Sequence, residues 1–123
     1  MGKKSQATRE STVLYQTIAL GAHQLKVRRA CDTRKHEYGM ADASGMWEAD
    51  LNRITVLSPE EPVVGARPPT PSFATCMHEI IHAMLDQSTT HLSLDDQEHV
   101  CDLLGERFAE LAIRNPEFWS AWV

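Results

Sequence analysis

Apolar residues recur with a helical period in the middle of the chain. Between residues 70 and 87 they are three or four positions apart, at Phe73, Met77, Ile80 and Met84. Thr70-Pro71 is a typical helix start, and no glycine or further proline follows before Gln87. This pattern predicts an amphipathic helix from residue 70 to residue 87.

A second helical period follows after a short polar segment. Ser93 and Asp96 have the spacing of a capping box, with Asp96 in place of the usual Glu or Gln. Apolar residues then recur up to about Arg114, at Cys101, Leu104, Phe108, Leu111 and Ala112. We expect a helix whose core-facing stripe is centred near Leu104 and Phe108. Because the loop from residue 87 to 91 is short, the two helices should be antiparallel neighbours.

The first half of the chain has the features of a small sheet. Short strand-like runs occupy residues 17–20, 25–29 and 53–57, while residues 11–16 are ambiguous between strand and helix. Residues 59–71 contain five prolines, which favour a stiff connector that could form one wall of a substrate groove. The expected fold is α+β: a small antiparallel sheet of about three strands, followed by the helix pair.

Length and composition indicate one small domain. With 123 residues, 42% of them hydrophobic, the chain can bury one modest core, which we assign to residues 11–123 after a flexible tail at 1–10. No apolar run approaches 18 residues and no export signal is evident. We therefore expect a cytoplasmic protein with no membrane partner. Its oligomeric state stays open.

Charge and cysteine content exclude further classes. The net charge of -5 disfavours nucleic-acid binding, because that binding needs a positive surface. A local basic cluster is more typical of a solvated strand face; it comprises Lys26, Arg28, Arg29, Arg34 and Lys35. Cys31, Cys76 and Cys101 lack Cys-x-x-Cys spacing, which indicates reduced, mostly buried thiols rather than disulfides or a thiolate zinc site.

The most informative motif is His-Glu-x-x-His, formed by His78, Glu79 and His82. On a helix, residues four apart lie about 40° from each other, so both imidazoles can reach one zinc ion. Glu79 lies about 100° around from His78, too far to complete the ligand set easily but suited to contact a water in an open coordination position. A surface helix with two histidines by chance is the competing interpretation.

The second helix offers a third ligand. On a helical wheel Glu98 lies roughly 90° from the centre of the expected stripe, with Asp102 slightly further round on the same face. Glu98 can therefore bind zinc while Asp102 accepts the N–H of a ligand histidine. The remaining acids and His99 point more towards solvent, and His99 or Asp95 is the next ligand candidate. An ordinary solvated acidic face is the alternative for this pair.

Taken together, His78-Glu79-x-x-His82 and Glu98-x-x-x-Asp102 resemble the gluzincin arrangement of zinc peptidases. The resemblance is closest to small ImmA/IrrE-type and phage-encoded metallopeptidase domains, and it covers about residues 17 to 119. Shorter fragments agree with it: Ile18-Ala19-Leu20-Gly21 before Leu25-Lys26-Val27, then Tyr38-Gly39 and Asn115-Pro116-Glu117-Phe118. It implies a sheet before the zinc helix and a glutamate ligand after it. The chain lacks the separate DNA-binding or sensor domain of the longer ImmA/IrrE proteins.

The expected activity is zinc-dependent hydrolysis of peptide bonds in a specific protein target. Zn²⁺ would be held by His78, His82 and Glu98, with Glu79 as general base. His91 and Tyr38 are candidate donors to the developing oxyanion. A phage-derived chain would act in the cytoplasm of a bacterial host. Two alternatives remain: a non-catalytic, zinc-stabilised phage or prophage accessory or binding module, and a helical-hairpin interaction protein without metal.

Overall fold

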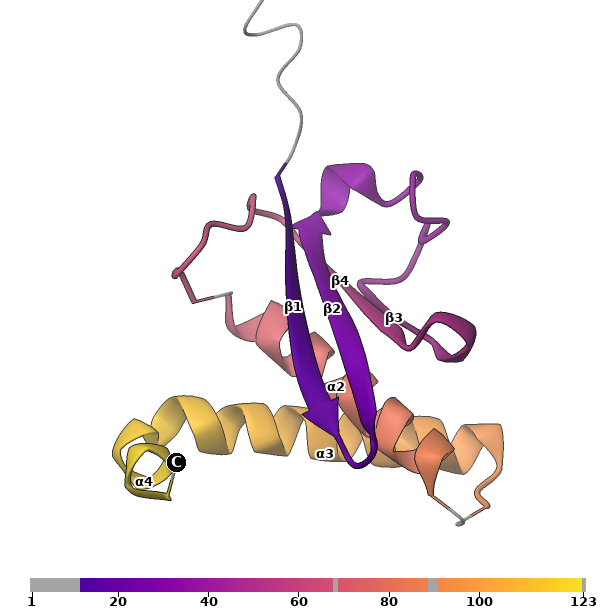
Figure 1. The fold of residues 1–123 in the computed structure, drawn as a ribbon, viewed down its shortest axis with the longest axis vertical. Helices are drawn as coiled ribbons and strands as arrows, with labels where there is room; N and C mark the ends of the chain where they lie inside the picture. The colour runs from indigo at the N-terminus through magenta and orange to yellow at the C-terminus, as the bar shows by residue number, and fades with distance from the viewer. Residues whose placement is uncertain (1–11, 68, 89–90, 123) are drawn as a thin grey trace, which may run out of the picture.

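The computed structural model of the chain describes residues 12–67, 69–88 and 91–122 (Figure 1). The predicted tail at residues 1–10 lies outside this part. The elements are, in order, β1 (Val13–Leu20), β2 (His23–Cys31), β3 (Gly45–Glu48), β4 (Arg53–Ser58), α2 (Thr70–Gln87), α3 (Leu94–Arg114) and α4 (Pro116–Trp122). The α+β class is confirmed. None of the helices in the described ranges has the length and apolar character needed to cross a membrane.

The sheet differs from the prediction in two details: it has four strands, and one of its pairs is parallel. The strand order is β1-β2-β4-β3, with β2 and β4 parallel and the other pairs antiparallel. This topology arises because the segment 32–44 carries the chain past the position beside β2, so that β3 forms at the edge of the sheet. β4 then occupies the position between β2 and β3. A strand in that central position needs apolar residues on both faces, and β4 is buried from Ile54 to Ser58.

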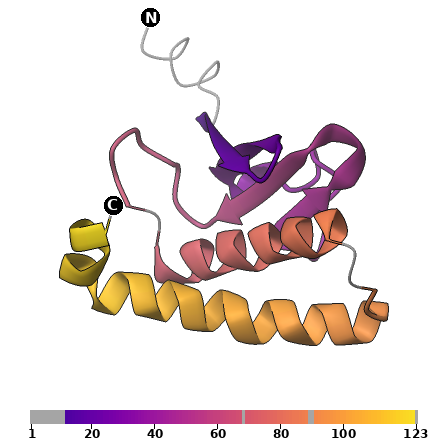
Figure 2. The ribbon, with the colours of Figure 1, turned by 60° about the horizontal axis from the view of Figure 1, so that its bottom comes forward.

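Two core clusters lie on opposite faces of the sheet. The inner cluster joins β2 and β4 to α2, through Leu25, Val27, Ile54, Val56 and Ala83. The outer cluster consists of Ala30, Leu57 and Met40, the last from the segment that folds over this face after β2. Figure 2 shows the resulting layers: α2 lies between the sheet and α3. The helix that carries the two histidines is therefore packed on both sides.

Both predicted helices have the expected ends. α2 spans the predicted residues 70–87, and α3 begins after Ser93, whose Oγ accepts a hydrogen bond of 3.1 Å from the Asp96 N–H. The phase of the core-facing stripe on α3 was wrong, because Leu104 and Phe108 are partly exposed. Small residues lie against α2 instead, at Cys101, Gly105 and Ala109. A Cβ at Gly105 would lie only 2.9 Å from the His78 Cα, so the helices approach too closely for large side chains at this face.

Candidate metal centre

The two histidines of α2 present the same ring nitrogen to one point in space. His78 Nε2 and His82 Nε2 are 3.2 Å apart, and both side chains are mostly buried between α2 and α3. Their shared direction follows from their spacing, because residues four apart lie one above the other on a helix. This confirms the prediction that the motif brings both imidazoles to one position.

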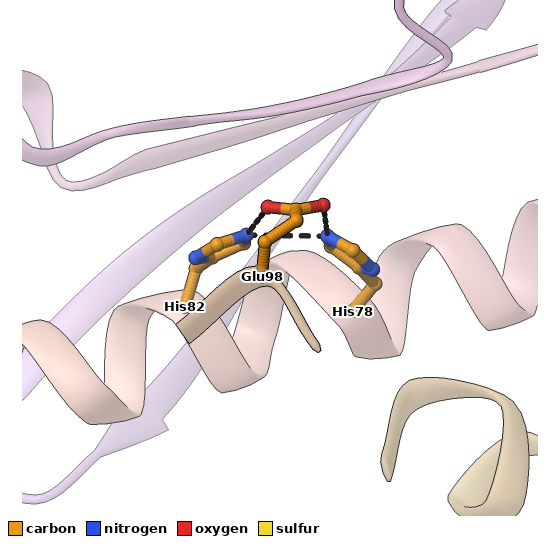
Figure 3. Close-up of side chains that lie close together, drawn as sticks. All are labelled: His78, His82 and Glu98. Atoms are coloured by element: carbon orange, nitrogen blue, oxygen red, sulfur yellow. Dashed lines mark hydrogen bonds and ion pairs between the residues drawn. The ribbon is translucent and has the colours of Figure 1, made fainter. Parts of the chain in front are cut away.

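Glu98 completes the cluster from α3. Its two carboxylate oxygens reach the two imidazoles separately, with Oε1 3.0 Å from His78 Nε2 and Oε2 2.9 Å from His82 Nε2 (Figure 3). Among the histidine, cysteine and carboxylate side chains in the described part of the chain, His78, His82 and Glu98 form a group whose ligand atoms all lie within 4.8 Å of one another. The structure therefore brings together the three residues that the sequence indicated as ligands.

The distances fit a single small cation. For bonds of about 2.0–2.1 Å, as zinc makes to imidazole nitrogen and carboxylate oxygen, tetrahedral geometry places ligand atoms about 3.3 Å apart. The observed separations of 2.9 to 3.2 Å are close to this value. Two imidazoles and one carboxylate are also ligands that zinc commonly takes. The donor set thus fits zinc and leaves room for a fourth, non-protein ligand.

Each histidine is also held through its second ring nitrogen. His78 Nδ1 lies 3.1 Å from Asp102 Oδ1, as expected for a carboxylate that orients a ligand imidazole. His82 Nδ1 lies 2.8 Å from Gln97 Oε1. With both Nδ1 atoms donating to oxygen, both Nε2 atoms present a lone pair to the centre. Gln97 was missed, although its place directly before Glu98 on α3 was a usable signal.

Glu79 lies beside the cluster, with only 8% of its surface exposed. Its Oε2 is 3.8 Å from His78 Nε2, beyond hydrogen-bond distance. Burial raises the pKa of this carboxyl, although the charges of His78 and His82 oppose the shift. A carboxylate with a raised pKa at this position is a better proton acceptor than an exposed glutamate.

The edge strand β3 holds Glu79 from the other side. The backbone N–H of Trp47 lowers the pKa of the Glu79 carboxyl, and Trp47 Nε1 donates to Asp86 Oδ2 over 2.5 Å, which ties β3 to the end of α2. Gly45 makes this approach possible, because a Cβ there would lie 2.5 Å from Thr75 Cγ2 and 3.1 Å from Glu79 Oε2. No strand was predicted at residues 45–48, so these contacts were not foreseen.

The cluster lies in an open cleft of about 420 Å³ between α2, α3 and the start of β3. Four acidic residues and no lysine or arginine line it, among them Glu106, which is exposed to solvent as predicted. His78 is the remaining ionisable residue that lines the cleft. Such a cleft attracts cations and positively charged groups and repels anions.

The two predicted oxyanion donors are not brought to this cleft. Tyr38 packs on the outer face of the sheet, where its ring centre lies 3.8 Å from the Arg28 guanidinium carbon. His91 is exposed in the connection before α3 and is not among the residues that line the cleft. Neither side chain is positioned to assist chemistry at the cluster in this conformation.

Comparison with known proteins gives no independent assignment. No protein-family model, curated protein or solved structure matches this chain. The chemistry of the cleft alone therefore indicates what the protein can do.

Proposed function

We propose that the protein is a zinc-dependent peptidase of the gluzincin type. The observation that carries this proposal is the convergence of His78 Nε2, His82 Nε2 and one carboxylate of Glu98 at separations of 2.9 to 3.2 Å. A catalytic zinc site usually has three protein ligands and keeps one position for water. A structural site usually has four protein ligands, so the donor set favours catalysis.

The residues around the cluster suit hydrolysis. When bound, zinc supplies Lewis-acid chemistry, since it acidifies water and polarises a carbonyl group. Glu79 takes the proton from the attacking water on its carboxylate and then passes it to the leaving amine. The backbone N–H of Trp47 lowers the pKa of that carboxyl, while Asp102 and Gln97 fix the two imidazoles. The open cleft leaves room for an extended peptide segment, and a protein or peptide is the proposed substrate.

The cytoplasm is part of the same proposal. All three cysteines are free, which suits a reducing compartment.

The first experiment measures metal content and hydrolysis together. Protein purified without added zinc should contain one zinc ion per chain by elemental analysis. Glu79→Gln should keep that zinc and the native fold but lower peptide hydrolysis by a factor of about 100 or more, because it removes the base without removing a ligand. Glu106→Gln is the matched control, since it neutralises another acid of the cleft and should leave the rate within about threefold.

The non-catalytic binding module predicts a different outcome. In that case Glu79→Gln retains zinc and every biological effect of the parent, because fold and surface are unchanged. A peptidase with a narrow target can ignore generic peptides, so the assay must include activity in the native host. Loss of the host effect with zinc still bound supports proteolysis, whereas full retention refutes it.

A further inference from the structure

A second cavity, of about 440 Å³, lies at the other side of α2 and shares no lining residue with the cleft. Its walls come from β1, from the inner faces of β2 and β4, from residues 64–67, and from the first two turns of α2. In Figure 1 the connection after β4 arches out beside β1 before the chain enters α2. The volume lies within the range of small-molecule sites, which is about 300–1,000 Å³.

One wall carries a half-buried cation, Arg29 of β2. Side chains alternate along a strand, so Arg29 follows Leu25 and Val27 on the inner face and lies in register with Val56 of β4. Within the described ranges no carboxylate pairs with its guanidinium and no acceptor receives a hydrogen bond from it. A guanidinium presents five N–H donors, and partial burial makes their lack of acceptors costly.

The other cations of β2 differ from Arg29 in this respect. Arg28, on the outer face, donates to Thr55 Oγ1 over 3.1 Å and stacks on Tyr38. Lys26 lies over the Tyr15 ring, also on the outer face. The outer-face cations Arg28 and Lys26 thus have partners within the chain, whereas Arg29 faces the cavity with no anionic partner among the residues that the structure describes.

Ser72 adds a second unused polar group. It lies in the first turn of α2, only 5% of its surface is exposed, and it lines the cavity. Among the described residues its hydroxyl has no hydrogen-bond partner. Pro69 at the N-cap provides no side-chain cap and the first turn of α2 contains no acidic residue, so nothing in the described residues at this end compensates the helix dipole. Arg67, at the exposed rim, contributes a further positive charge.

The remaining walls are mostly apolar, and their apolar side chains include Leu14, Val56, Val64 and Phe73. We propose that this cavity binds a small aliphatic carboxylate. The carboxylate accepts hydrogen bonds from Arg29 and Ser72, and the hydrocarbon chain packs against Leu14, Val56 and Phe73. A monoanion is favoured over phosphate, because the half-buried guanidinium of Arg29 offsets one negative charge and its planar fork matches a carboxylate, whereas the charge of Arg67 lies at the rim, where solvent screens it.

Titration of octanoate into the full-length ¹⁵N-labelled protein tests this proposal. We expect saturable shifts of backbone amides that line the cavity, such as those of Leu14, Arg29 and Phe73, with no comparable shift at His78 or Glu98. Octanol lacks the charge, acetate lacks the chain, and inorganic phosphate lacks the chain and is more highly charged. Each of these probes should bind at least tenfold more weakly than octanoate.

Variants then separate the specific site from general attraction of anions. Arg29→Gln should weaken octanoate binding at least tenfold, as expected for loss of a charge-assisted pair, while Arg29→Lys retains part of the affinity. Ser72→Ala should weaken it less and is a second probe if Arg29→Gln does not fold. Lys26→Gln, the matched control, removes the same charge from the other face of β2 and should change affinity less than twofold.

Three results would overturn the proposal. They are octanol or phosphate binding as tightly as octanoate, an equal loss of affinity in Lys26→Gln and Arg29→Gln, and the absence of saturable shifts at these amides. Each would show that the cavity does not select an aliphatic monoanion through Arg29. Because the cavity lies apart from the metal cluster, none of these results depends on whether the protein binds zinc.

Discussion

The two helices that build the candidate metal centre are held in different ways. α2 is packed against the sheet on one side and α3 on the other, and its histidine side chains are only 16–17% exposed. α3 is covered along one narrow face, and its Glu98 and Asp102 side chains are 55% and 65% exposed. Two of the three donors, His78 and His82, are thus built into the core, while the third, Glu98, depends on the contact between the two helices.

This difference suggests a division of roles. The histidines keep their positions as long as the fold is intact, because moving α2 would disrupt the inner core cluster. Glu98 keeps its position only if α3 stays docked through Cys101, Gly105 and Ala109. Zinc, by binding donors from both helices, would fasten α3 to α2. Substitutions on α3 should therefore lower the zinc affinity strongly, even where they change the packing of the core only slightly.

The largest effect is expected from removing the ligand that α3 contributes. Glu98→Ala should weaken zinc binding by more than about 100-fold, since it leaves two imidazoles and no charged ligand on the cation. Competition with a chromogenic zinc chelator measures the affinity. Glu106→Ala, two turns further along α3, is the control and should remain within about threefold. Normal affinity in Glu98→Ala would mean that another residue is the third ligand, with His99 or Asp95 tested next.

A smaller effect is expected from the residues that orient the histidines. Asp102→Ala and Gln97→Ala should each weaken zinc binding by roughly 10 to 100-fold, which is typical when the partner of a ligand imidazole is lost. Asp102 should have the larger effect, because its carboxylate accepts a stronger hydrogen bond than a neutral amide. The same competition assay would contradict this account if both variants bound zinc like the parent.

The residues that could be predicted are those whose roles depend on short sequence spacing. His78, Glu79 and His82 needed only the helical period, and the limits of α2 followed from Thr70-Pro71 and the uninterrupted run to Gln87. Glu98 and Asp102 were found because they share one face of α3. The helix cap at Ser93 was predictable for the same reason, because its hydrogen bond joins Ser93 to the residue three positions further along the chain.

Contacts that depend on close approach between elements could not be read in this way. A hydropathy wheel weights large apolar side chains, so it placed the docking face of α3 at Leu104 and Phe108 rather than at Gly105. β3 has four residues and begins with glycine, which is unfavourable in a strand, yet Gly45 is there because Thr75 and Glu79 leave no room for a side chain. At both positions the glycine indicates a close contact between two elements only when the neighbouring element is known.

The docking face itself can be tested with one methyl group. Gly105→Ala places a Cβ against the His78 backbone, so the helices must separate, and we expect a loss of about 1–3 kcal/mol in the free energy of unfolding. The higher helix propensity of alanine acts in the opposite direction. Urea denaturation without zinc measures the change, with the exposed Arg107→Ala as control. A Gly105→Ala variant as stable as the parent would mean that the two helices can move apart without loss.

The smallest effect concerns how each helix begins. Ser93 caps α3 through the Asp96 N–H, whereas α2 starts after Pro69 without a side-chain cap. Since α3 is packed on only one face, it should depend more on this local bond. Ser93→Ala should therefore cost about 1 kcal/mol in the free energy of unfolding, and Ser93→Gly only a few tenths, because glycine is tolerated at this position. Thr70→Ala, at the first residue of α2, is the matched control and should change stability by less than about 0.5 kcal/mol.

Urea denaturation of the three variants tests the contrast directly: equal losses in Ser93→Ala and Thr70→Ala would show that the two helices depend on their starts to the same degree. Ser93→Ala should also weaken zinc binding more than Thr70→Ala does, because fraying of α3 at Ser93 loosens the turn that contains Gln97 and Glu98.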